Sequence, residues 1–173
     1  MPLWASKKTD RSIMKPMRRA DRQKDARWAL EVFDKAPFVT VSMTRPDGTP
    51  YGVPLSLARK DEKTFYFHCA GEGKKLDCLK VNPLVSLSAV SECASVFEEN
   101  TRNFTEHFHS AIAVGKVEFV TDNAEKTAAL HLICQRFLPQ YMAHFEAAVA
   151  RSLAHTTICR ITLTEPPVGK CKS

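Results

Sequence analysis

The sequence predicts an α+β fold in which a small antiparallel β-barrel is flanked by helices. Three β-rich runs follow one another between residues 37 and 70 with short connections, which is typical of an antiparallel meander rather than of βαβ units. Segments with apolar residues at helical spacing lie at the start of the chain and late in it. About six strands are expected in all, with helices on their flanks.

The first predicted element is a helix over 21–35, which Pro37 ends. Pro46, Asp47 and Gly48 then form a turn signal between two apolar runs, which predicts a hairpin. The next predicted elements are a strand over 64–69, a helix over 76–81, a strand over 84–90 and a polar loop over 91–105. A strand over 108–121 follows, with a bulge at Gly115, and then a helix from Asp122 with Glu125 in a capping box. The last two are a helix over 141–153 and a strand over 156–164.

Length and composition fit one globular domain. The chain has 173 residues, 44% of them hydrophobic and 25% charged, which is enough for a single hydrophobic core. No apolar run approaches the roughly 20 residues that cross a bilayer, and the first residues lack the apolar stretch of a secretory signal. We therefore expect a cytoplasmic location and no membrane contact.

The cysteines argue against a zinc-stabilised protein, and the distribution of charge argues against a nucleic-acid-binding protein. The six cysteines are dispersed without a C-x-x-C pair, which argues against a structural zinc site and favours reduced thiols. The net charge is +6, but eight of the 25 basic and two of the 19 acidic residues lie in residues 1–24, so the rest of the chain is neutral. The excess is typical of a solvated leader more than of a nucleic-acid contact.

The strand over 51–58 has one face of small residues. Gly52, Pro54, Ser56 and Ala58 alternate with larger apolar side chains, so one face of the strand is nearly flat. A planar ligand could approach the backbone there. Tight packing by a helix explains the same pattern, and the pattern alone favours that second interpretation.

The loop AGEGKK, residues 70–75, combines flexible backbone N–H groups, a helix start, and the cations Lys74 and Lys75. Two cations at the positive end of a helix dipole are unfavourable unless they are solvated or an anion lies near them. These are the parts of a phosphate site, although the spacing is neither a Walker loop nor a Rossmann fingerprint. His68 comes just before this loop, as a scaffold residue or as a proton source.

Two further signals are weaker. His107 and His109 would share one face of a strand, but two imidazoles alone make no metal site, and we expect no metal. No G-x-S-x-G nucleophile motif occurs in the sequence. The chain thus offers no self-sufficient catalytic group, and a cofactor would have to supply the reactivity.

The order of several motifs resembles the flavin-binding split barrel of the pyridoxamine 5′-phosphate oxidase superfamily, in its nitroimidazole-resistance branch. The resemblance covers about nine-tenths of the chain. It is carried by MRRADR at 17–22, PYGVP at 50–54, YFHCA at 66–70, GKKLDCLKVNP at 73–83, FHSAIAVGKVEFV at 108–120, DNAEKTAAL at 122–130 and ICRITLTEPPVGK at 158–170. It implies a six-stranded antiparallel split β-barrel over residues 17–173, preceded by a basic N-terminal arm over 1–16.

The resemblance also implies a homodimer with FMN bound at the subunit interface, FAD being the other flavin to consider. Lys75, together with Lys74, would pair with the flavin phosphate. The other implied flavin contacts are Val53, Pro54, Leu55 and Ser56 along the isoalloxazine, His68, Cys69 and Ala70 along the ribityl chain and phosphate, and Ser110 on the long strand.

The activity implied is that of an FMN-dependent reductase. Its acceptor would be a small planar molecule, for example a nitroaromatic such as a 5-nitroimidazole, which His68 would orient or protonate. The C-terminal TEPPVGKCKS lacks the Arg- and Trp-containing ending of true pyridoxamine phosphate oxidases, so vitamin B6 is not the expected substrate. The alternative is a carrier or sensor without turnover that holds a flavin or a haem, and for a haem the chain offers His107, His109, His131, His144 and His155. A deazaflavin is a third cofactor within the enzyme class.

Overall fold

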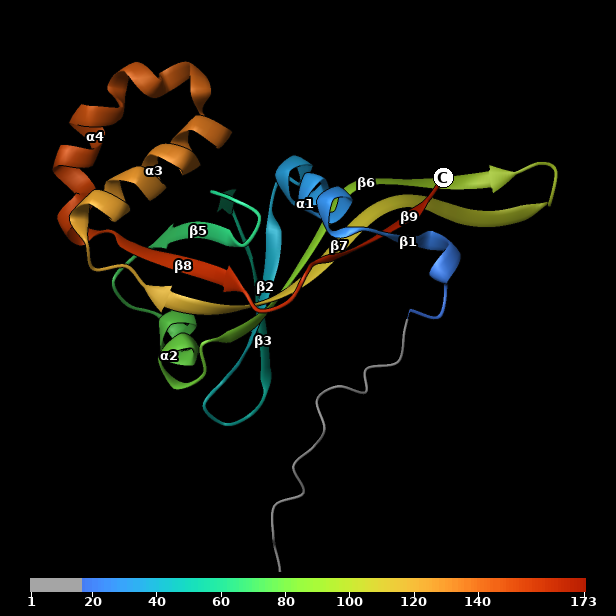
Figure 1. The fold of residues 1–173 in the computed structure, drawn as a ribbon, viewed down its shortest axis with the longest axis horizontal. Helices are drawn as coiled ribbons and strands as arrows, with labels where there is room; N and C mark the ends of the chain where they lie inside the picture. The colour runs from blue at the N-terminus through green and yellow to red at the C-terminus, as the bar shows by residue number, and fades with distance from the viewer. Residues whose placement is uncertain (1–16) are drawn as a thin grey trace, which may run out of the picture.

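The computed structural model describes residues 17–173; the predicted basic N-terminal arm, residues 1–16, lies outside the described residues. Within 17–173, nine strands form one antiparallel sheet (Figure 1). They are β1 (Gln23–Lys24), β2 (Val39–Thr44), β3 (Pro50–Leu55), β4 (Ala58–Arg59), β5 (Thr64–Cys69), β6 (Leu84–Glu98), β7 (Asn103–Phe119), β8 (Thr157–Leu163) and β9 (Val168–Lys172). The helices are α1 (Ala26–Lys35), α2 (Lys74–Val81), α3 (Asn123–Phe137) and α4 (Phe145–Ser152), with 3₁₀ turns η1 (Ala20–Arg22), η2 (Pro139–His144) and η3 (Leu153–His155).

The sheet curls into a barrel because its two edge strands are adjacent in sequence. The strand order is β3-β2-β6-β7-β8-β5-β4, and β9 pairs with β7 and β1. Only Ser56 and Leu57 connect β3 at one edge with β4 at the other. The three Cα-to-Cα steps from Leu55 to Ala58 span no more than about 11 Å, so the edges must approach each other at a seam. This seam positions the candidate site.

The barrel interior is apolar. The inward side chains of β2 (Val39, Val41 and Met43) and of β5 (Phe65 and Phe67) are buried there. Helix α1 covers one side of this core with Ala29, Leu30, Val32 and Phe33, and the Asp25 side chain caps it by accepting from the Trp28 N–H. Helix α2 connects β5 to β6 and adds Leu76 and Leu79 to the same core.

A second apolar cluster lies outside the barrel, where α3 and α4 cover β5 and β8 (Figure 1). Tyr66 lies at its edge, and its hydroxyl donates to Glu125 over 2.8 Å. Arg160 donates to Glu125 over 2.7 Å and to Glu118 over 3.0 Å. Burial and the Glu125 carboxylate raise the pKa of Tyr66 to about 12. The start of α3 is therefore attached to β5 and β8 by polar contacts as well as by packing.

Arg136 at the end of α3 connects three elements. Its guanidinium donates to the carbonyl oxygens of Phe33, Asp34 and Ala36 at the end of α1, over 2.7, 2.9 and 2.9 Å. It also donates to the carbonyl of Leu57 in the seam. Because the last carbonyls of a helix have no partner within the helix, this cation satisfies groups that would otherwise need water.

The six predicted strands are present as β2, β3, β5, β6, β7 and β8, and the α+β class is confirmed. The short strands β1, β4 and β9 were not predicted, and the predicted strand over 51–58 is interrupted after Leu55 by the seam. The first helix starts at Ala26 rather than 21, because a 3₁₀ turn and β1 precede its cap. The predicted helix over 141–153 is divided between η2, α4 and η3. The capping box at Asp122 is confirmed, since its side chain accepts from the Glu125 N–H.

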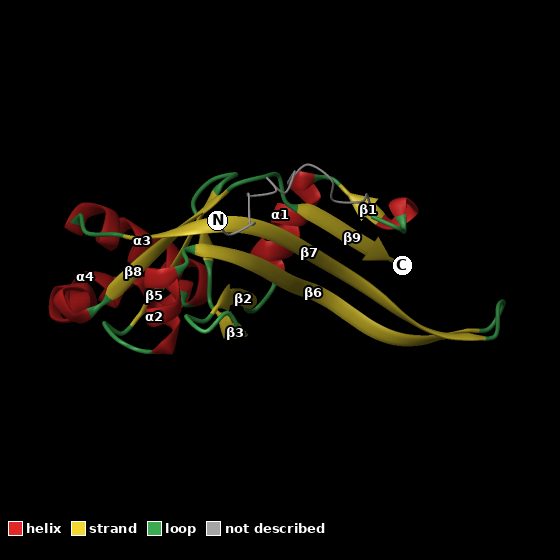
Figure 2. Cartoon of the chain, turned by 90° about the horizontal axis from the view of Figure 1, so that it is seen from below, coloured by secondary structure: helices red, strands yellow, loops and turns green. Residues whose placement is uncertain are grey.

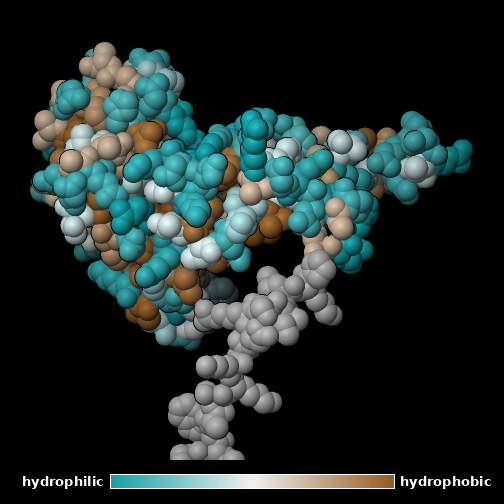
Figure 3. Space-filling view, in the orientation of Figure 1, coloured by the Kyte–Doolittle hydropathy of each residue, from teal (hydrophilic) through white to brown (hydrophobic). Residues whose placement is uncertain are grey.

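The prediction of a loop over 91–105 is wrong. Residues 92–107 form a two-stranded ribbon, the β6–β7 ribbon, which projects well beyond the barrel (Figures 1 and 2). Its sequence is polar because both of its faces are largely exposed, so it lacks the alternation that marks a half-buried strand. The end of the ribbon is mostly hydrophilic, with apolar patches closer to the barrel (Figure 3).

The predicted bulge is also misplaced. The β6–β7 register shifts between Val90 and Glu92, whereas Gly115 pairs regularly with Val85 and Leu163. A Cβ at Gly115 would lie 2.6 Å from Cγ2 of Ile161, so the glycine permits close packing between β7 and β8. Among residues 17–173, no helix is both long and apolar enough to span a bilayer.

Candidate functional site

The ends of β3 and β5 meet at the seam. Ala58 pairs with Tyr66, so Ser56, two residues before Ala58, lies close to the end of β5. The structure thereby brings together the predicted residues of the β3 end, Pro54 to Ser56, and those of the β5 end, His68 to Ala70.

The two faces of β3 differ as the alternation predicts. Tyr51, Val53 and Leu55 point inward and pack against the barrel core, while Gly52 and Pro54 are exposed. Of the predicted isoalloxazine contacts, Pro54 and Ser56 therefore present side chains to the outside, whereas Val53 and Leu55 can offer only their backbone. A Cβ at Gly52 would lie 3.4 Å from Oγ of Ser42, so this outer face is a flat floor of small side chains.

An open outer face extends from β3 across the sheet. In antiparallel strands, directly opposite residues share a face, and the register joins Pro54, Thr40, Ser88, Ile112 and Val168 in one row over five strands. Ile112 in this row is 58% exposed, and no described segment covers it.

The same face continues along the β6–β7 ribbon. Alternate residues of β7 lead from Ile112 through Phe108 to Phe104, which is 89% exposed and packs on Phe97 with ring centres 4.9 Å apart. The small-residue floor at β3 and the exposed Phe97–Phe104 pair near the ribbon end thus belong to one continuous surface, the outer sheet face.

Backbone donors gather in the loop before α2. Within residues 17–173, no N–H from Gly71 to Lys75 donates a backbone hydrogen bond, whereas the N–H groups of Leu76 and Asp77 both donate to the Gly73 carbonyl. Gly73 precedes α2 with a φ of 129°, a conformation that side chains rarely adopt. The prediction placed the helix start at 76; it starts at Lys74, so both lysines lie in its first turn. Unpaired N–H groups and two cations form a donor set suited to a phosphate.

Lys75 is half-buried against the end of β5. Its Nζ lies 5.2 Å from the centre of the Phe67 ring, beside His68 and Cys69, while Lys74 is exposed. Partial burial and the Lys75 charge lower the pKa of His68 below its ordinary value. The imidazole is therefore neutral at pH 7 and can donate one N–H.

Cys69 and Cys159 form a thiol pair at the same end of the barrel. A hydrogen bond between the two side chains, opposed by burial and assisted by Lys75, lowers the pKa of Cys69 to about 7. The same hydrogen bond and burial raise the pKa of Cys159. Of the two thiols, Cys69 is therefore the one that ionises at the lower pH, with Cys159 as the hydrogen-bond donor to its thiolate.

Ser110 is not brought to this cluster within one chain. It lies on β7 opposite Val90 and Lys170, and its hydroxyl donates to the Lys170 carbonyl over 3.4 Å. Phe119, which pairs with Cys159, is nine residues further along β7, a separation of about 30 Å in an extended strand.

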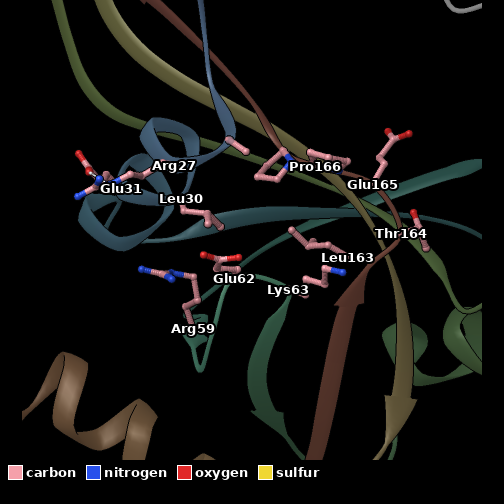
Figure 4. Close-up of a pocket in the computed structure, with 12 residues that line it drawn as sticks. Arg27, Leu30, Glu31, Arg59, Glu62, Lys63, Leu163, Thr164, Glu165 and Pro166 are labelled. Carbon is pink, nitrogen blue, oxygen red and sulfur yellow. Dashed lines mark ion pairs between the residues drawn. The ribbon is translucent and has the colours of Figure 1, made fainter.

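Two large clefts lie at the surface, one beside the candidate phosphate loop and one near the start of β5. One, of about 790 Å³, lies on the other side of the Gly71–Glu72 loop and is lined by Lys80, Phe119, Lys126 and His155 among others. The other, of about 770 Å³, lies between α1, the β4–β5 connection and the segment after β8 (Figure 4). It contains none of the predicted site residues, and its Arg59 is paired with Asp34. No cluster of three or more metal-ligating side chains occurs within 17–173.

A sequence profile of the family described as pyridoxamine 5′-phosphate oxidase matches residues 25–168, which is most of the chain. This chain belongs to that family. As in other members, its barrel is a split barrel, in agreement with the seam between β3 and β4. No curated protein matches the sequence significantly.

Solved structures share the fold of this pyridoxamine 5′-phosphate oxidase family member. A candidate 5-nitroimidazole antibiotic resistance protein from Bacteroides thetaiotaomicron is 24% identical, with a TM-score of 0.72 over 86% of this chain and 87% of that one. The flavocytochrome Anf3 from Azotobacter vinelandii is 18% identical (TM-score 0.77, 91% and 72% covered). The FAD and heme binding protein from Mycobacterium smegmatis is 22% identical (TM-score 0.75, 88% and 74% covered). At these identities the likeness concerns the fold alone.

Proposed function

We propose that this chain binds a flavin, with the flavin phosphate held by Lys75 and by the N–H groups of Gly71 to Lys75. The observation that carries the proposal is this loop, in which exposed donors without backbone partners and two lysines converge at the start of α2. FMN is the smallest flavin that satisfies the site. Membership of the pyridoxamine 5′-phosphate oxidase family, and the names of a similar flavocytochrome and of a similar FAD and heme binding protein, support a flavin without distinguishing FMN from FAD.

The proposed activity is reduction of a small planar acceptor, with 5-nitroimidazoles as the class to test first. A bound flavin supplies hydride or electrons. The floor around Gly52, Pro54 and Ser56 leaves room for a planar ring against the backbone. His68, neutral at pH 7, would donate a hydrogen bond that orients the acceptor.

We propose further that the working unit is a homodimer formed through the outer sheet face. One chain offers the site a floor but no opposite wall, because the described residues leave the row from Pro54 to Val168 open. A ribbon of two strands is marginally stable alone, and this one carries the exposed Phe97–Phe104 pair on the same face. A second copy would cover both surfaces and could bring Ser110 to the partner's site.

Two of the five histidines that the haem-carrier alternative offers already have partners in the fold. His107 lies 3.6 Å from Glu98, and His109 lies 3.2 Å from Glu92 with its ring 5.2 Å from Trp28. Both imidazoles are thus already engaged on the face of the sheet toward α1. The same alternative includes a flavin carrier without turnover. The rate at which an acceptor reoxidises the reduced flavin separates such a carrier from a reductase.

The test has two parts. In the first, flavin is titrated into the parent protein, Lys75→Ala and the matched surface variant Lys35→Ala, with fluorescence quenching as the readout. We expect at least a tenfold loss of affinity in Lys75→Ala only, since a charge-assisted phosphate contact is removed.

In the second part, flavin-loaded protein is reduced anaerobically and mixed with a 5-nitroimidazole. Stoichiometric reoxidation faster than that of free reduced FMN is expected. Tight flavin binding without reoxidation by any nitroaromatic would contradict the reductase and support a carrier.

A further inference from the structure

The cleft of about 790 Å³ beside the candidate phosphate loop has no role in the function proposed so far. Its rim is the outer side of the loop, Ala70 to Glu72, and its other walls come from α2, the end of β7, the start of α3 and the segment around η3. Its volume lies within the range of about 300–1,000 Å³ that is typical of small-molecule sites.

Helix α2 directs different residues to the two sides of the loop. Leu76 and Lys80 are four residues apart and line the cleft, whereas Lys75 lies over Phe67 beside His68 and Cys69. Gly71 and Glu72, whose N–H groups have no backbone partner, line the cleft and also belong to the loop of the proposed phosphate site. A ligand with two linked phosphates could therefore contact donors on both sides of one loop.

The cleft is cationic and has an apolar wall. Lys80 and Lys126 line it together with the single carboxylate of Glu72. The Lys126 ammonium donates to the Leu153 carbonyl over 2.9 Å, which fixes its position and leaves two of its three donors free. Phe119, 38% exposed, contributes an aromatic ring to the same cleft. A second phosphate and a purine ring match this combination of cations and an accessible ring face.

We propose that this cleft binds the adenylate half of a dinucleotide flavin, so that the protein prefers FAD to FMN. The proposal rests on the flavin function above and names the form of the cofactor. The flavin-side phosphate lies at Lys75, the second phosphate lies near Lys80 and Lys126, and the adenine lies against Phe119.

The experiment compares the dissociation constants of FMN and FAD by fluorescence quenching in the intact chain and three variants. Phe119→Ala removes the ring, Lys80→Ala removes an exposed cation of the cleft, and Lys116→Ala is a matched control on the exposed surface of β7. We expect the parent and Lys116→Ala to bind FAD at least about tenfold more tightly than FMN. Phe119→Ala and Lys80→Ala should each lose most of that difference while their affinity for FMN stays unchanged.

Each other outcome overturns the proposal in a recognisable way. Equal affinity of the parent for FMN and FAD, or variants that weaken both flavins alike, contradicts the adenylate site and leaves the flavin function standing. If the parent does not distinguish the flavins but Phe119→Ala weakens NADPH binding, the cleft serves the reductant instead. If neither flavin binds, the flavin function itself fails.

Discussion

The Lys75 ammonium lies 5.2 Å from the centre of the Phe67 ring, at the end of the barrel where Cys69 and His68 also meet. The positive charge of Lys75 lowers the pKa of both neighbours, because it disfavours the imidazolium form of His68 and favours the thiolate form of Cys69. The Lys75 charge thus adds to burial in lowering the pKa of His68, and to the Cys159 hydrogen bond in lowering the pKa of Cys69.

The Cys69 thiol should therefore react at unusually low pH. Because Cys159 and Lys75 favour its thiolate, the rate of alkylation by iodoacetamide should rise with a midpoint near pH 7, rather than near the ordinary value of 9.0. Peptide mapping by mass spectrometry separates Cys69 from the exposed Cys93. Lys75→Ala should move the midpoint upward, and bound flavin should slow the reaction.

The same shift has a consequence for stability. The folded-state pKa of Cys69 is below the unfolded value, so its contribution to the free energy of unfolding is present above about pH 9 and is lost as the pH falls through 7. Cys69→Ser should remove this pH dependence. A Cys69 midpoint near pH 9 in the parent would contradict the proposed thiolate.

Replacement of His68 should separate turnover from flavin binding. His68→Ala should keep most of its flavin affinity, because Lys75 and the loop N–H groups are untouched, and once saturated with flavin it should reduce the acceptor at least about tenfold more slowly. Stopped-flow reoxidation of the reduced flavin measures this rate. His144→Ala, an exposed histidine at the start of α4, serves as control. Equal rates in His68→Ala and the parent would show that His68 is scaffold only.

Arg136→Met should destabilise the fold without changing the site directly. It leaves four carbonyl oxygens of the α1 end and the seam without their donor, and we expect a loss of about 1–3 kcal/mol in the free energy of unfolding. Urea denaturation compares it with Arg151→Met, an exposed arginine near the end of α4. A loss no greater than that of Arg151→Met would mean that water replaces the guanidinium.

Phe104 near the end of the β6–β7 ribbon should be required for a stable homodimer. Light scattering should give a dimer for the parent and a monomer, or a dimer weakened at least about tenfold, for Phe104→Ser, because an exposed ring on the proposed interface is lost. Tyr141→Ser removes another exposed ring, from η2 outside the outer sheet face, and should remain dimeric. A monomeric parent would contradict the interface.

Local signals account for the parts of the fold that the sequence predicts well. The bounds of β5 agree with the expected strand because alternating apolar residues lie between a turn and a glycine loop. The β6–β7 ribbon was missed because its two exposed faces carry polar residues, so no period-two pattern marks it. Its pairing depends on contacts between strands rather than on composition.

The candidate site could be predicted only where its residues are contiguous. His68, Lys74 and Lys75 lie in one stretch with recognisable loop chemistry. The cleft that combines Lys80, Phe119 and Lys126 comes from three separate elements, and only the strand order brings them together. The inward orientation of Val53 and Leu55, by contrast, agrees with the alternation of large and small residues that the sequence already shows.

The absorption spectrum of the purified protein, recorded with added FMN or FAD and repeated for Lys75→Ala, tests flavin binding at the 71–75 loop most directly. We expect flavin bands at near-stoichiometric level in the parent and their loss in the variant. A colourless parent that takes up neither flavin, or a Soret band from bound haem, would contradict the proposed site.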